Sequence, residues 1–139
     1  MFKDFHKASS AEINTGTEDN KYVTPKGITD SILRKKQTSE ASSATPTPTG
    51  NYYENEYYLT ALATDAEFAA PSGTLSNGNT LLIRIKDNGT ARALTWNAVY
   101  RGIGLTLPAT TTISKTMYVG GIYNSADSKW DIVSVITEK

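Results

Sequence analysis

The stretch TLLIRIKDNGTARALTWN, residues 80–97, decides the fold class of this chain. Leu81, Ile83 and Ile85 are apolar, while Arg84 and Lys86 fall between or beside them, which is the period-two pattern of a strand with one buried face. The Asp-Asn-Gly sequence that follows tolerates the positive φ angles of a tight turn. The stretch therefore predicts a β-hairpin within a β domain.

Segments on both sides of this stretch show the same sequence pattern, in which short apolar segments are separated by turn residues. The predicted strands cover residues 57–64, 80–86, 91–97, 116–124 and 129–137. A second hairpin is predicted at NSADSK, between the last two strands, and both tryptophans are expected in the core. The fold class is therefore mainly β, and residues 52–139 are expected to form a small antiparallel β-sandwich or jelly-roll head.

The N-terminal third is polar and is divided into three segments. Residues 1–23 have too few apolar groups to exclude water and are expected to form an extended peptide. Thr24 and Pro25 favour a helix start, and the apolar spacing predicts one short helix over residues 24–36. Residues 37–51 are rich in Ser, Thr and Pro, which predicts a semi-rigid spacer before the head.

Composition narrows the possible functions. Fourteen basic and fourteen acidic residues give a formal net charge of zero, which argues against nucleic acid as a partner. The chain contains no cysteine, so disulfides, thiolate metal sites and cysteine nucleophiles are excluded. No apolar run approaches the roughly 18 residues of a membrane span, and no secretion signal is recognisable. We therefore expect a soluble protein without membrane insertion.

An ordered series near the N-terminus resembles a motif found near the attachment ends and segment joints of bacteriophage tail fibres and related virion fibres. The series comprises Ala8-Ser9, Glu12, Gly16-Thr17, Asp19-Asn20, Lys21, Val23-Thr24-Pro25 and Ile28. Residues 83–104 and 107–135 also look like the β-structured head modules that end such fibres. Together these resemblances cover nearly all of the chain.

The resemblance implies a parallel homotrimer anchored to the particle by its N-terminus. The helix independently favours self-association, because a helix of about a dozen residues with an apolar stripe is marginal alone. The expected trimer interface comprises Thr24, Pro25, Ile28, Ile32, Leu33, Tyr53 and Tyr57. The residues expected to dock on other proteins of the tail, baseplate or capsid are Phe2, Phe5, Ile13, Gly16 and Thr17.

Loops of the head are the best candidates for ligand contacts, because they carry adaptable polar groups. The candidate residues are Asn77, Asn79, Tyr100, Arg101, Asn124 and Asp127. Catalytic residues, metal ligands and cofactors are not predicted: the single histidine, His6, has only Asp4 nearby. The acidic pairs Glu54/Glu56 and Asp127/Asp131 are interpreted as solvated loop and edge charges rather than as a glycosidase pair.

The expected function is that of a structural virion fibre protein without enzymatic activity, located on the phage tail or capsid surface. Its β head would bind a host-surface glycan or protein by multivalent adhesion. The alternative is a capsid decoration, head fibre or adaptor protein that joins virion components without binding a receptor. A third possibility, a depolymerase acting on cell-surface glycan, finds no support in the sequence.

Overall fold

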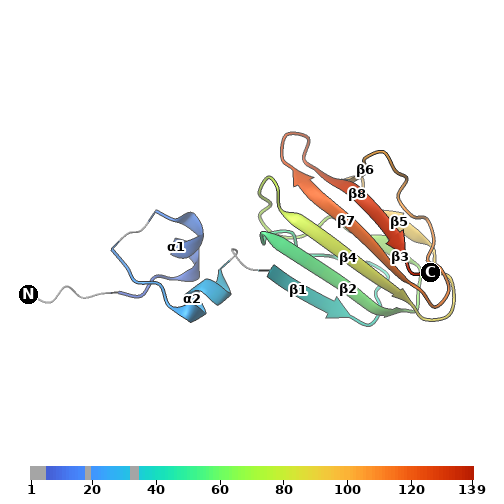
Figure 1. The fold of residues 1–139 in the computed structure, drawn as a ribbon, viewed down its shortest axis with the longest axis horizontal. Helices are drawn as coiled ribbons and strands as arrows, with labels where there is room; N and C mark the ends of the chain where they lie inside the picture. The colour runs from blue at the N-terminus through green and yellow to red at the C-terminus, as the bar shows by residue number, and fades with distance from the viewer. Residues whose placement is uncertain (1–5, 18–19, 32–34) are drawn as a thin grey trace, which may run out of the picture. The chain divides into compact units, whose positions relative to one another are not determined.

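The computed structural model describes residues 6–17, 20–31 and 35–139. The chain divides into two compact units, Met1–Lys35 and Lys36–Lys139. The larger unit is mainly β, as predicted (Figure 1). Its strands are β1 (Lys35–Glu40), β2 (Glu54–Leu62), β3 (Ala66–Phe68), β4 (Thr80–Asp87), β5 (Leu94–Trp96), β6 (Tyr100–Gly102), β7 (Thr116–Asn124) and β8 (Lys129–Thr137).

Six of these strands form one sheet in the order β1-β2-β4-β7-β8-β6, and β3 pairs with β5 in a second, two-stranded sheet. The prediction of an antiparallel head is wrong, because the large sheet is mixed. The pairs β4–β7 and β7–β8 are antiparallel, whereas β2–β4, β6–β8 and β3–β5 are parallel. Parallel neighbours require a crossover between them, and residues 63–79, which include β3, supply it between β2 and β4.

The hairpin predicted at residues 87–89 is also wrong, since β5 pairs with β3 rather than with β4. The buried Asp87 carboxylate accepts hydrogen bonds from the Gly89 amide (2.7 Å), the Ser114 amide (2.9 Å) and the Thr111 hydroxyl (2.6 Å). These contacts turn the chain out of the large sheet. The neighbour of β4 on that side is β7, which comes from much later in the chain.

The second predicted hairpin is confirmed, because β7 and β8 pair antiparallel from Asn124↔Lys129 inward. Both strands have the bounds that alternation predicted. A bulge between Gly120 and Gly121 shifts the register, which places Ser134 opposite Gly120 and Ile132 opposite Gly121. The hairpin therefore carries a kink about half-way along its length.

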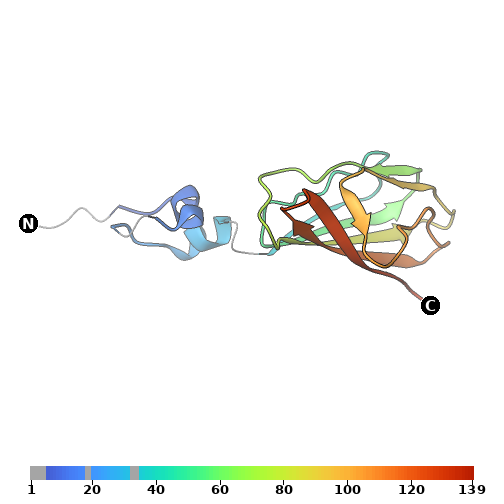
Figure 2. The same ribbon diagram turned by 90° about the horizontal axis from the view of Figure 1, so that it is seen from above.

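The core lies on one face of the large sheet, and the two views in Figures 1 and 2 show the rest of the unit covering that face. Phe68, Trp96 and Tyr100 form an aromatic row across it, with the Phe68 and Trp96 rings stacked 4.4 Å apart. The fully buried residues include Trp130, Phe68, Leu59, Leu62, Ile83, Ile85, Ile132 and Val119. The expectation that Trp130 is a core residue is confirmed, and Trp96 packs against the same cluster.

The predicted spacer is part of the β unit. Residues 36–40 belong to β1, a polar strand at one edge of the large sheet. In the segment that follows, backbone carbonyls accept hydrogen bonds from the chain around β3. The Ala44, Pro46 and Pro48 carbonyls accept from the amides of Glu67, Ala69 and Ser72, respectively. Proline lacks an amide donor but keeps its carbonyl, so Pro46 and Pro48 accept these hydrogen bonds without leaving a buried amide donor unpaired. Both prolines are fully buried.

The smaller unit contains a helix where an extended peptide was predicted. Ser9 and Glu12 form a reciprocal capping box at the start of α1 (Ser10–Thr15), and Gly16 ends the helix in the left-handed conformation with φ 63°. Lys21 forms an ion pair with Glu12. That ion pair, together with hydrogen bonds from Ser9, lowers the pKa of Glu12 to about 2.

The second helix, α2 (Pro25–Asp30), is shorter than the predicted helix over residues 24–36. Thr24 caps it and Pro25 occupies its first position, as predicted. Ser31 ends it in an extended conformation and donates its hydroxyl to the Ile28 carbonyl. No helix in the described parts of the chain is long and apolar enough to cross a membrane.

Candidate ligand-binding site

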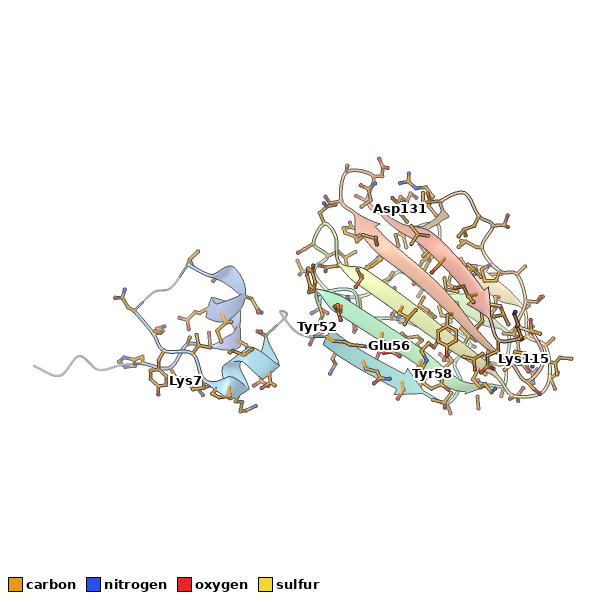
Figure 3. All side chains as sticks on the ribbon, viewed as in Figure 1. Lys7, Tyr52, Glu56, Tyr58, Lys115 and Asp131 are labelled. Carbon is orange, nitrogen blue, oxygen red and sulfur yellow. The ribbon has the colours of Figure 1, made fainter. Side chains whose placement is uncertain are left out.

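An open pocket of about 460 Å³ lies beside the turn end of the β7–β8 hairpin, close to Asp131, which Figure 3 labels. Its lining combines an apolar floor with a rim of amide and carboxylate groups. The lining residues are Asn77, Gly78, Ile103, Ile122, Tyr123, Asn124, Asp131 and Val133. They come from the loop before β4, from both strands of the hairpin and from the loop after β6.

Arg101 of β6 organises the charged side of this pocket. Its Nε donates to Asp131 Oδ1 at 2.8 Å, and its Nη2 donates to Asp127 Oδ2 at 2.8 Å. One guanidinium thus holds two carboxylates, and the hydrogen bond to Asp127 is the main cause that raises the pKa of Arg101. Partial burial alone would raise the pKa of Asp131, but hydrogen bonds from Arg101 and Asn124 lower it.

Two asparagines tie the neighbouring loops together. Asn124 Nδ2 donates to Asp131 Oδ2 at 3.2 Å, while Asn124 Oδ1 accepts from the Ala126 amide at 3.1 Å. Asn77 Oδ1 accepts from the Ser125 amide at 3.0 Å, which joins the loop before β4 to the hairpin turn. The rim is therefore pre-arranged by its own hydrogen bonds, and Asn77, Asn124 and Asp131 all line the open pocket.

The structure brings four of the six predicted ligand-binding residues together here, namely Asn77, Arg101, Asn124 and Asp127. The other two are corrected. Asn79 is buried and donates to the Gly50 carbonyl at 2.7 Å. Tyr100 is buried in the core, where its hydroxyl donates to the Ala69 carbonyl at 2.9 Å and burial raises its pKa. Both side chains serve the fold rather than the rim.

The residues expected at a trimer interface are scattered. Thr24 and Pro25 form the start of α2, and Ile28 on that helix is 53% exposed. Tyr53 is 64% exposed, whereas Tyr57 is buried in the core of its own unit and bonds to Glu40. Burial raises the pKa of Tyr57. Tyr57 therefore offers almost no surface to a second chain. Ile32 and Leu33 lie outside the described residues.

Three of the residues expected to dock on the virion lie in or beside α1. Ile13 packs toward α2, since a Cβ placed at Gly27 would lie 2.8 Å from Ile13 Cδ1. Gly16 is the left-handed helix cap, and the Thr17 hydroxyl lies 3.3 Å from that of Thr15. Ile13 and Gly16 thus stabilise the small unit itself. Phe2 and Phe5 lie outside the described residues.

Sequence reasoning missed the outer sheet face, which we define as the side of the large sheet opposite the core. Arg84 lies over the Tyr58 ring at 4.0 Å and within 5.9 Å of Tyr118, and it forms an ion pair with Glu56. Figure 3 labels Glu56 and Tyr58 on this face. Next to this cluster lie the exposed apolar side chains of Tyr118, Ile122, Val133 and Ile136. In residues 116–124 and 129–137 these exposed side chains alternate with core residues. This alternation is the sequence signal that could have predicted an apolar outer sheet face.

The described residues hold no group of three or more His, Cys, Asp or Glu side chains placed to bind a metal ion.

Comparisons with known proteins identify no relative of this chain. No protein-family model matches the chain, and no curated protein and no solved structure shows significant similarity to it.

Proposed function

We propose that this chain is a non-enzymatic fibre protein of a phage virion, a homotrimer whose β unit is a sandwich-like head that binds a host-surface ligand. The observation that carries this proposal is the pocket beside the β7–β8 turn, which Asn77, Asn124 and Asp131 line and beside which the Arg101 guanidinium holds Asp127 and Asp131. The N-terminal motif supports the assignment to virion fibres, because its Ser9, Glu12, Gly16 and Thr24 all have capping roles in a compact unit.

The pocket chemistry fits an uncharged polar ligand such as a surface glycan. Two carboxylates share one guanidinium, so the rim keeps one net negative charge, which disfavours anionic ligands and offers acceptor lone pairs to hydroxyl donors. Ile103, Ile122 and Val133 provide apolar surface for the C–H groups of a sugar. Recognition with a few oriented polar groups over an apolar floor is typical of small-molecule sites.

Substitution of a rim asparagine tests this proposal. We expect Asn77→Ala to weaken binding of the fluorescently labelled full chain to cells of the host bacterium about tenfold or more, because a polar contact at the pocket rim is lost. The matched control is Asn88→Ala, an exposed asparagine in the turn after β4 that lines no described pocket. Circular dichroism checks that both variants remain folded. Equal cell binding by the two folded variants would contradict a ligand site at this pocket.

Absence of catalysis is part of the proposal. A retaining or inverting glycosidase needs one carboxylic acid with a raised pKa. At this pocket the pKa of Asp131 is lowered, and Arg101 forms ion pairs with both Asp127 and Asp131. These carboxylates therefore suit hydrogen-bond acceptance rather than proton donation.

Self-association is proposed to involve the outer sheet face in addition to α2. Tyr118 and Ile136, which are paired on β7 and β8 and lie outside the ligand pocket, are exposed apolar groups that favour burial against protein. We expect light scattering at micromolar concentration to give three times the chain mass, and Ile136→Lys to reduce that mass, because a charge would be buried at the contact. Thr95→Lys, at an exposed position of β5 in the two-stranded sheet, is the matched control. A monomeric natural chain would overturn the trimer.

The alternative function, a capsid decoration or adaptor that contacts only virion proteins, is favoured by this same apolar face. Electron microscopy with antibody raised against residues 36–139 distinguishes the two. Label at the tail tip supports receptor binding. Label over the capsid supports the alternative, and in that case Asn77→Ala should leave attachment of the virion to cells unchanged.

A further inference from the structure

Asp127, in the β7–β8 turn, lies beside the ligand pocket without lining it. Of the described residues that line the pocket, Asp131 alone is charged. The side chain of Asp131 is 20% exposed, whereas that of Asp127 is 50% exposed. Both carboxylates are bound to Arg101, which does not line the pocket either. Asp127 can therefore act on a ligand in this pocket through its charge, without touching the ligand.

The Nη2 atom of Arg101 connects the two carboxylates. It lies 2.8 Å from Asp127 Oδ2 and 2.7 Å from Asp131 Oδ1. The Nε atom of the same guanidinium donates to Asp131 Oδ1 at 2.8 Å and makes no bond to Asp127. Arg101 would therefore stay bound to Asp131 if the charge of Asp127 were removed, and the two would form a one-to-one ion pair.

One positive charge faces two negative charges at this rim, which leaves one negative charge in excess. The other polar partner is uncharged, since Asn124 Nδ2 donates to Asp131 at 3.2 Å and to Asp127 at 3.4 Å. Lys129 is the basic residue nearest in sequence, but its Nζ donates to the Ala98 carbonyl at 2.6 Å. Within the described part of the chain, Lys129 forms no ion pair with either acid. The excess charge is thus not balanced by a second basic side chain.

We propose that Asp127 determines the specificity of the ligand pocket, because its charge keeps the rim negative and so excludes acidic glycans such as those built from uronic acids. This inference rests on the proposed function, since it takes a glycan to be the ligand. Repulsion between two like charges a few ångströms apart near a protein surface is enough to weaken binding about tenfold. A neutral sugar escapes this repulsion and keeps the apolar surface of Ile103, Ile122 and Val133.

Replacing Asp127 with asparagine separates the effect of charge from that of shape. The two side chains have nearly the same size, and an amide oxygen can still accept from Arg101 Nη2. The rim becomes neutral, because Arg101 then balances Asp131 alone. We expect the affinity for neutral sugars to change little, whereas the affinity for acidic sugars should rise.

Nuclear magnetic resonance titration of the full chain at neutral pH measures both affinities. The side-chain amide signals of Asn77 and Asn124, which line the pocket, report binding of glucose, galactose and mannose and of the corresponding uronic acids. For the natural chain we expect a dissociation constant on the order of millimolar for at least one neutral sugar. Its uronic acid should bind about tenfold more weakly. Asp127→Asn should bring this ratio of affinities close to one.

Glu67→Gln is the matched control, because it removes the same charge from an exposed position of β3 that lines no described pocket. This variant should keep the ratio of the natural chain. Salt gives a second measurement that needs no variant. The Debye length falls from about 10 Å at 0.1 M salt to about 3 Å at 1 M, so the ratio for the natural chain should decline toward one in concentrated salt.

The outcomes separate this inference from the proposed function. Equal binding of neutral and acidic sugars by the natural chain would refute the role of Asp127 and leave the pocket standing as a glycan site. A ratio that persists in Asp127→Asn would do the same. No response of Asn77 or Asn124 to any of the sugars would refute the glycan site, and this inference with it. Asn77→Ala, followed through the Asn124 signal, should weaken both affinities and leave their ratio unchanged.

Discussion

Replacing Gly102 with alanine should destabilise the β unit more than any other glycine substitution near the pocket. A Cβ at this position would lie 2.2 Å from the Leu105 carbonyl oxygen and 3.2 Å from its carbon. The obstacle is backbone, so no side-chain rotation can relieve it. Relief would require the loop after β6 to move away from β8, where the Ile103 amide donates to the Ile132 carbonyl at 2.9 Å.

The expected cost is about 3 kcal/mol, the upper range for forcing an extra carbon into a packed site. For a unit of this size, the melting temperature should fall by roughly 10–20 °C. Gly104→Ala is the matched control: its Cβ would meet open space, and only the positive φ of 68° would be unfavourable, at about 1 kcal/mol. Thermal unfolding by circular dichroism gives both values. Equal melting temperatures for the two variants would contradict this packing.

Replacing Asp87 with alanine should have a comparable effect. The change leaves three donors without their acceptor, namely the amides of Gly89 and Ser114 and the hydroxyl of Thr111. Charged hydrogen bonds of this kind contribute more than neutral ones, and we expect a loss of about 3 kcal/mol in the free energy of unfolding. Asp65→Ala is the control, because Asp65 accepts one exposed bond, from the Ala93 amide.

The same carboxylate predicts a dependence of stability on pH. Burial would raise the pKa of Asp87, but the hydrogen bonds from Thr111, Ser114 and Gly89 outweigh it, and the pKa is lowered. A lowered pKa means that the carboxylate stabilises the fold above its ordinary value of about 4 and that this stabilisation is lost as pH falls through the lower folded value. Urea unfolding midpoints measured downward from neutral pH should decline less in Asp87→Ala. Parallel curves for the two proteins would contradict the assignment.

Alternation predicted the long strands well, and of the short strands it predicted only β5, which lies within the predicted strand 91–97. Residues 116–124 and 129–137 are strands with the predicted bounds, because nine residues of alternating burial specify a face unambiguously. Strands β3 and β6 have three residues each, too few to show a period. Strand β1 reads KKQTSE and carries no apolar residue, so its place in the sheet depends on partners rather than on its own pattern.

The topology errors share one physical cause, which is that local turn chemistry does not select a distant partner. Asn88-Gly89 does form a turn, with Gly89 at φ 104°, but the Asp87 side chain bonds to residues of the 111–114 loop and fixes a different route. In the smaller unit, by contrast, the signal for the start of α1 is local and can be read from the sequence. Ser9 followed by Glu12 is a capping-box signature, yet the low apolar content of the segment argued for an extended peptide.

The candidate site was predictable in kind and not in detail. Loop position correctly grouped Asn77, Asn124 and Asp127 as polar groups near a surface. It could not tell that Asn79, two residues from Asn77, turns inward to Gly50. It also gave no hint that Asp127 shares an arginine with a second acid, since that contact follows from three-dimensional packing alone.

The two edge strands of the large sheet affect how copies of the chain associate at high concentration. One border is β1, which has two lysines and one glutamate among its six residues, and the other is β6, which is only three residues long. Both are poor templates for an incoming strand of another molecule. At high concentration, chains should therefore come together through side chains, while amyloid-like growth from backbone to backbone stays blocked.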